Sequence, residues 1–81
     1  MWYTYVLECA DGRLYVGSTG DLDRRLEEHK SGGVTTTSRR LPVQLVYFEA
    51  RLSKQKAQQR ERYFKTGFGR GYLKKEINTP Q

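Results

Sequence analysis

The chain has 81 residues, of which 36% are hydrophobic and 30% are charged. This composition predicts one small globular domain over residues 1–81 and excludes a collagen-like chain, a disordered tail and a two-domain enzyme. A membrane span of ~20 apolar residues is absent from the sequence, and the N-terminus lacks the basic start and apolar run of a signal peptide. The single cysteine, Cys9, cannot form an internal disulfide. We therefore expect a soluble cytoplasmic domain.

Positive charge is concentrated in the last third of the chain. The net charge is +6, but residues 1–50 hold six basic and seven acidic side chains, whereas residues 51–81 hold nine basic and two acidic ones. Aromatic residues such as Tyr63 and Phe68 lie between these cations. Such a segment is the expected electrostatic footprint of a protein that binds a polyanion. A solvated helix face in a basic protein would have the same composition.

The first predicted element is a β-hairpin. Aromatic and β-branched residues predict strands at 2–9 and 13–18, separated by a turn. Two turns are compatible with the sequence. A two-residue Asp-Gly turn would place Tyr5 and Tyr15 on opposite faces of the sheet, whereas a three-residue loop with a left-handed Gly12 would place them on one face.

A helix is predicted next, from the N-cap Asp21 to about Lys30. The stripe at i, i+3, i+4 and i+7 spacing consists of Leu22, Arg25, Leu26 and His29. An inward stripe that is half Leu and half Arg or His is unusual for a purely structural helix.

The second half of the chain is predicted to hold a loop at 32–41, a strand at 43–48 and a helix at about 54–66 capped by Ser53. Three glycines are predicted to break the chain before a short final helix near 72–77; they are Gly67, Gly69 and Gly71.

Glu61 is a candidate functional residue because it shares the inward stripe of the 54–66 helix with Ala57 and Phe64. A buried carboxylate needs a cation, either an arginine or a metal ion. Arg25 is one candidate, in which case the pair would be structural.

Common catalytic patterns are missing. One Cys and one His cannot build a zinc site, the glycine run at 67–71 follows a helix instead of a strand, and no P-loop is present. What remains is the set of hairpin tyrosines, Arg25, His29 and Glu61. A carboxylate can hold Mg²⁺, arginine can bind phosphate, and Tyr or His can transfer a proton, which together suit phosphodiester hydrolysis.

The order of these residues resembles the GIY-YIG nuclease domain. The motifs are Tyr3-Thr4-Tyr5, Tyr15-Val16-Gly17, Arg25, His29 and Glu61. Segments 41–49, 57–62 and 65–75 are similar to small stand-alone members of that superfamily. The resemblance covers nearly the whole chain, although Tyr3-Thr4 stands where the family name has Gly-Ile.

The resemblance implies an α+β fold, with a three-stranded antiparallel sheet flanked by helices in β-β-α-β-α-α order. It also implies a metal-dependent endonuclease that uses Mg²⁺ or Mn²⁺. Glu61 would hold the metal, Arg25 would bind the scissile phosphate, and His29 would handle a proton or contact a phosphate. Tyr5 and Tyr15 would point into one site, which favours the three-residue turn. Asn78 is the one candidate for an asparagine that some members carry.

Nucleic acid is the expected partner, with DNA preferred to RNA and with selectivity for structure or a weak sequence preference. The candidate contacts are Thr37, Arg39, Arg40, Lys54, Arg62, Lys65 and Arg70. DNA repair or recombination is the expected setting, and a protein partner could supply targeting. The alternative is a non-catalytic nucleic-acid-binding module that uses the basic C-terminal segment. The sequence leaves the oligomeric state open.

Overall fold

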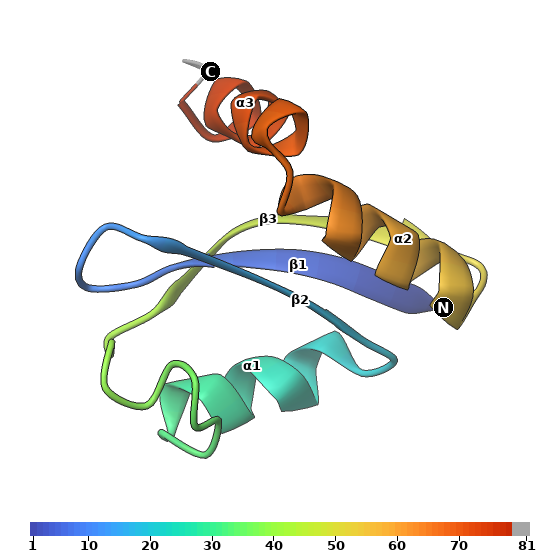
Figure 1. The fold of residues 1–81 in the computed structure, drawn as a ribbon. Coiled ribbons are helices and arrows are strands. Elements are labelled where there is room, and N and C mark those ends of the chain that lie inside the picture. Colours follow the sequence, from blue (N-terminus) through green and yellow to red (C-terminus); the bar gives the residue numbers. More distant parts are fainter. Residues whose placement is uncertain (79–81) are drawn as a thin grey trace.

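A three-stranded antiparallel sheet separates one helix from two others (Figure 1). The computed structural model describes residues 1–78. Its elements are β1 (Trp2–Glu8), β2 (Leu14–Thr19), α1 (Leu22–Lys30), β3 (Gln44–Arg51), α2 (Lys54–Phe64) and α3 (Gly67–Asn78). The strand order is β2-β1-β3, so β2 lies at one edge. The expected α+β class and order of elements are confirmed. Within these residues, no helix is long and apolar enough to cross a membrane.

The hairpin between β1 and β2 uses the three-residue turn. Leu7 pairs with Tyr15 across the two strands, and Gly12 has the left-handed φ of 80° that this loop requires. The register places Tyr5 and Tyr15 on the same face of the sheet, and their ring centroids lie 6.3 Å apart. The alternative two-residue turn is wrong for this chain.

Alternate residues of β1 enter two hydrophobic clusters on opposite faces of the sheet. The α1 cluster has a buried centre of Tyr5, Leu7, Cys9 and Val43, against which Leu22 and Leu26 of α1 pack. The α2–α3 cluster has a buried centre of Val6, Val16, Phe64 and Leu73. Burial of these side chains is the main force that fixes the three helices on the sheet.

Both longer predicted helices begin at the predicted caps. The Asp21 carboxylate accepts the N–H of Arg24, and the Ser53 hydroxyl accepts the N–H of Lys56. Such caps satisfy backbone donors that have no partner inside the helix. Helix α2 ends at Phe64, slightly earlier than expected, and β3 continues to Arg51, beyond the predicted end of the strand.

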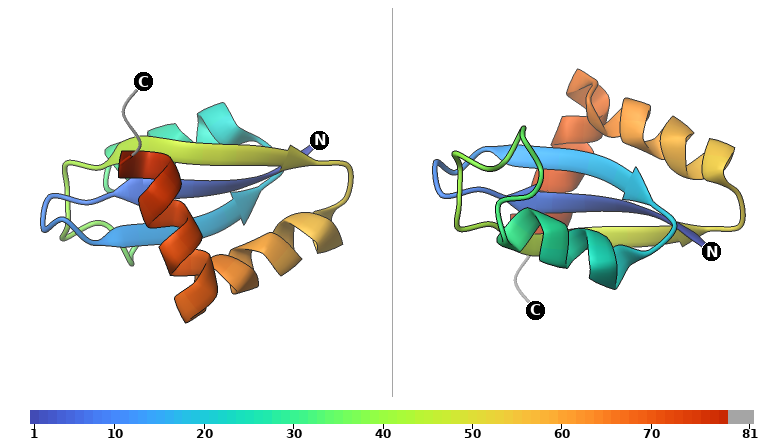
Figure 2. Two further views of the ribbon diagram at one scale, coloured as in Figure 1. Left: turned by 90° about the horizontal axis from the view of Figure 1, so that it is seen from above. Right: turned by 90° about the horizontal axis from the view of Figure 1, so that it is seen from below.

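The prediction for the final helix is wrong, because α3 begins at Gly67 and includes all three glycines. A Cβ atom on Gly69 would collide with the backbone carbonyl of Tyr63 at the end of α2. The missing side chain therefore lets α3 pack directly against α2. Figure 2 shows that α3 crosses over the strands after this close contact.

Candidate active site

A buried chain of hydrogen bonds joins β1, α1 and the loop that follows α1. The Tyr5 hydroxyl lies 2.8 Å from His29 Nε2, and His29 Nδ1 lies 2.8 Å from Thr37 Oγ1. Tyr5 is 1% exposed, and His29 and Thr37 are fully buried. Folding of the loop over the end of α1 thus gives both ring nitrogens of His29 a partner.

The neighbours of this hydrogen-bond chain indicate which of its atoms carry protons. The Thr37 hydroxyl has an acceptor in the carbonyl oxygen of Val34, 3.5 Å away, and so can accept a hydrogen bond from His29 Nδ1–H. Nε2 then carries the lone pair and accepts the hydrogen bond that Tyr5 donates. The tautomer is assigned from these partners.

Burial keeps both groups of this pair neutral. It raises the pKa of Tyr5 to about 12, an effect that the nearby Arg25 guanidinium only partly offsets. It also lowers the pKa of His29 from its usual 6.5, and the charge of Arg25 acts in the same direction. At neutral pH, Tyr5 therefore keeps its proton and donates a hydrogen bond to a neutral imidazole.

Two sequence-based expectations change with these positions. Thr37 was expected to contact nucleic acid, but its side chain is fully buried and serves as a partner of His29. His29 has no exposed surface with which to contact a phosphate, so of its two expected roles only proton handling stays a prediction. The role of Thr37 was missed because the sequence does not show how the loop folds.

Gly17 positions the Tyr5 ring. The two residues are paired across β1 and β2, and a Cβ atom on Gly17 would lie 2.6 Å from the Tyr5 hydroxyl and 2.7 Å from Cζ. The phenol packs directly against the glycine because no side chain projects there. The sequence alone gives Gly17 no role of its own, although its place opposite Tyr5 in the register of the three-residue turn is a usable signal.

Arg25 and Glu61 do not pair with each other, contrary to the structural alternative. The Arg25 guanidinium lies 3.3 Å from the carboxylate of Glu28. The Glu61 carboxylate accepts a hydrogen bond from the Ser18 hydroxyl through Oε1 at 2.8 Å and from Lys65 Nζ through Oε2 at 2.9 Å. Arg25 and Glu61 remain 35% and 24% exposed. Both can reach a ligand that displaces a partner.

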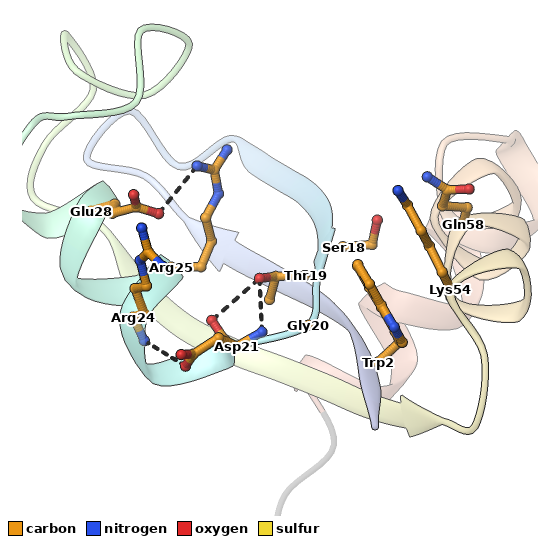
Figure 3. A pocket seen from close by; sticks show the side chains of 10 residues that line it. All are labelled: Trp2, Ser18, Thr19, Gly20, Asp21, Arg24, Arg25, Glu28, Lys54 and Gln58. Atoms are coloured by element: carbon orange, nitrogen blue, oxygen red, sulfur yellow. Dashed lines mark hydrogen bonds and ion pairs between the residues drawn. The ribbon is translucent and has the colours of Figure 1, made fainter.

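A groove runs between α1 and α2 at the end of the edge strand β2 (Figure 3). This edge groove has a volume of about 490 Å³. Its lining residues are Trp2, Ser18, Thr19, Gly20, Asp21, Arg24, Arg25, Glu28, Lys54 and Gln58. Arg25 lines it directly, and Ser18 connects it to Glu61 through the hydrogen bond described above. The partly exposed Tyr15 lies next to His29, with ring centroids 5.0 Å apart, and does not line the groove.

Glu61 fits a metal site that relies on one protein carboxylate. Within residues 1–78, no group of three or more His, Cys, Asp or Glu side chains could hold an ion. Mg²⁺ is commonly held by one or two carboxylates together with water and substrate phosphate. For Glu61 to serve in this way with both oxygens, Lys65 would have to release Oε2.

The other expected nucleic-acid contacts lie on both sides of the sheet. Arg39 is exposed in the loop after α1, and Arg40 pairs with Asp11. Lys54 lines the edge groove, and Lys65 pairs with Glu61. Arg62 and Arg70 are exposed on α2 and α3, and Asn78 is the last residue of α3 and does not line the groove.

Comparison with known proteins gives consistent matches. Residues 1–76 match the family model of the GIY-YIG catalytic domain. A UPF0213 protein of Streptococcus agalactiae is 55% identical over 64 residues, covering 78% of this chain and 73% of that protein. One of Bacillus pumilus is 52% identical over 65 residues, covering 79% of this chain and 66% of that protein. The solution NMR structure of a UPF0213 protein from Bacillus halodurans superimposes with a TM-score of 0.61 and 38% identity, covering 99% of this chain and 89% of that one. Sequence and fold thus match the same group of proteins.

Proposed function

The chain belongs to the GIY-YIG catalytic-domain family, a nuclease family, and on that premise we propose that it is a metal-dependent endonuclease that hydrolyses phosphodiester bonds in DNA. The observation that carries the proposal is the buried Tyr5–His29–Thr37 chain directly behind Tyr15 and Arg25. A neutral, doubly hydrogen-bonded imidazole beside a phenol is arranged to accept a proton. A purely structural role would not require that arrangement next to an accessible guanidinium.

Arg25 binds the scissile phosphate in this proposal. Its guanidinium exchanges the half-buried Glu28 carboxylate for phosphate oxygens and stabilises the charge that develops on them. The exchange costs little free energy, because an ion pair that is open to solvent contributes only about 0 to 1 kcal/mol.

The tyrosines and His29 handle the proton of the attacking water. Water gives a proton to Tyr15, Tyr15 passes its own to Tyr5, and Tyr5 passes its own to His29 Nε2. Thr37 holds the Nδ1–H of the resulting imidazolium. The water oxygen forms a bond to phosphorus, the bond to the leaving sugar oxygen breaks, and that oxygen takes a proton from solvent. The imidazolium then returns its proton to solvent through Tyr5 and Tyr15, which restores the starting state. Because burial raises the pKa of Tyr5 to about 12, transfer through a neutral phenol is favoured over a standing phenolate.

Glu61 would hold Mg²⁺ or Mn²⁺, and a bound ion would supply positive charge next to the phosphate oxygens. Ser18 orients the carboxylate through Oε1. Lys65 neutralises Oε2 when no ion is present.

Cleavage assays with matched variants test the proposal. Single-stranded, duplex and branched DNA, and RNA, would each be incubated with Mg²⁺, Mn²⁺ or EDTA. We expect metal-dependent cutting of DNA, lost in Glu61→Gln and reduced about 100-fold in Arg25→Gln. Arg13→Gln removes the same charge from an exposed position in the turn between β1 and β2, outside the groove, and should cut nearly normally. A folded Glu61→Gln protein that cuts as well as the wild type would refute the proposal, with folding checked by circular dichroism. Preference for branched DNA would support a setting in repair or recombination.

The second candidate is a non-catalytic nucleic-acid-binding module. The Lys65–Glu61 ion pair favours it, because that pair already neutralises the carboxylate without a metal. This candidate predicts salt-sensitive binding that persists in EDTA and in Glu61→Gln, with no cutting under any condition.

A further inference from the structure

We propose that the edge groove binds one nucleotide of the substrate strand, with its base against Trp2 and its phosphates between Lys54 and Arg24. The inference rests on the proposed function in that the bound strand is the one the nuclease cuts. The edge groove has a volume of about 490 Å³, which lies within the range of sites for small ligands.

Trp2 is placed as a contact surface instead of a core residue. It belongs to neither hydrophobic cluster of the sheet, and it is only partly buried at the end of β1. A Cβ atom on Gly20 would lie 3.4 Å from the ring, so Gly20 gives the ring a close backbone support. Aromatic side chains held in this way bind bases of every sequence by stacking. A large indole in a groove otherwise lined by polar residues therefore points to a nucleobase.

Two cations flank the groove without an acidic partner. Lys54 Nζ lies over the Trp2 ring, 5.4 Å from its centre. Its flexible side chain would move aside for a stacked base and keep one positive charge next to it. At the opposite end, Arg24 projects from α1 (Figure 3). Neither side chain forms an ion pair within residues 1–78, whereas Asp21 caps α1 and Glu28 pairs with Arg25. The acidic side chains of the groove are thus already engaged, and the remaining charge suits phosphate.

The positions of Trp2, Arg25 and Glu61 set the path of the bound nucleic-acid strand. Arg25 lines the same groove as Trp2, and Ser18 connects the groove to Glu61. A nucleotide on Trp2 would therefore lie next to the phosphate held by Arg25. Recognition by stacking and phosphate contacts also explains how so small a domain could bind without reading a sequence.

Trp2 is the single tryptophan of the chain, so its fluorescence reports on this position alone. The wild-type chain in EDTA would be titrated with an unlabelled single-stranded oligodeoxynucleotide while tryptophan emission is recorded. A fluorescein-labelled copy would give the dissociation constant by anisotropy. We expect saturable quenching of tryptophan emission, with the dissociation constant that anisotropy gives. An abasic oligonucleotide of equal length should bind more weakly and leave the emission unchanged.

Variants separate the base contact from general charge. Trp2→Leu should weaken binding about tenfold and Trp2→Phe by less, because a smaller ring still stacks. Lys54→Gln should weaken binding more than Lys56→Gln, which removes the same charge from the same turn of α2 but lies outside the groove. Arg24→Gln should also weaken binding and leave the maximal quenching unchanged.

The outcomes are distinct. Binding by anisotropy with no change in tryptophan emission overturns the inference, as does equal quenching by the abasic strand or equal effects of the two lysine substitutions. Absence of any binding overturns it too. Quenching by RNA as well as by DNA supports the site with the sugar left unread. Because EDTA prevents metal-dependent cutting, quenching without any nuclease activity in Mg²⁺ would support this site and refute the proposed function separately.

Discussion

Replacing Gly17 with alanine tests whether the close packing of Tyr5 is essential to the buried hydrogen-bond chain. The new Cβ atom would lie 2.6 Å from the Tyr5 hydroxyl oxygen, below the 3.0 Å that real Cβ atoms essentially always keep. The ring is rigid and buried, and its hydroxyl is bonded to His29. Tyr5 therefore cannot swing into solvent to relieve the contact.

The expected cost has two parts. Inserting a methyl group into a packed interior typically costs about 1 to 3 kcal/mol. Displacing the phenol also breaks the hydrogen bond to His29, and a buried polar atom left without a partner costs about 1 to 3 kcal/mol. Since both arise from one movement, we expect Gly17→Ala to lower the free energy of unfolding by about 2 to 4 kcal/mol. That is a large share of the stability of a domain this small.

Urea unfolding, followed by circular dichroism, measures this effect. Gly71→Ala is the matched control, because its Cβ atom would meet nothing within 4 Å and it lies inside α3. There the same substitution should stabilise the protein by up to about 1 kcal/mol. If Gly17→Ala unfolded within about 0.5 kcal/mol of the wild type, the packing argument and the fixed position of Tyr5 would both be refuted.

Three further predictions concern the interior. Thr37→Val should lower the free energy of unfolding by about 1 to 3 kcal/mol, because His29 Nδ1 loses its buried partner, and Thr37→Ser should cost less; equal losses in urea unfolding would contradict the hydrogen bond. Lowering the pH from about 7 to about 5 should also destabilise the fold, because burial lowers the pKa of His29 below 6.5 and the unfolded chain then binds the proton more readily. His29→Gln should lack that part of the pH dependence, and an unchanged pH profile would argue against it. Gly69→Ala should lower the thermal midpoint far more than Gly71→Ala, because its Cβ atom meets the backbone of Tyr63, which cannot rotate away; similar midpoints would show that α3 does not need this contact.

Local sequence signals predicted most helices and strands, because the ends of these elements depend mainly on residues that are neighbours in the sequence. Asp21 and Ser53 cap the helices as expected. The turn of the hairpin was not decided by local rules, since both turns place Gly12 acceptably. The choice followed only from the resemblance, and the observed register agrees with it.

The beginning of α3 could not be predicted, because glycine has two opposite meanings there. Its low helix propensity argues for a break, whereas its small size allows α3 to approach the end of α2. The second effect depends on a contact between helices. The packing of Gly69 on Tyr63 outweighs the local preference.

The residues of the candidate site also divide into those that local spacing predicts and those that depend on tertiary contacts. Tyr5, Tyr15 and His29 converge because their register and helical spacing are fixed by the sequence. Thr37 reaches His29 only through the course of the loop, for which the sequence gives no pattern. The contact of Glu61 with Lys65 has the i,i+4 spacing of a helical ion pair and could have been predicted.

The two hydrophobic clusters allow the halves of the site to change separately over evolution. Arg25 and His29 are carried by a helix on the α1 cluster, whereas Glu61 is carried by a helix on the α2–α3 cluster. Conservative substitutions in one cluster would reposition one half and leave the other in place. Among the described residues, only β1 supplies side chains to the buried centres of both clusters. It is therefore the segment in which we expect the fewest tolerated substitutions in a deep mutational scan.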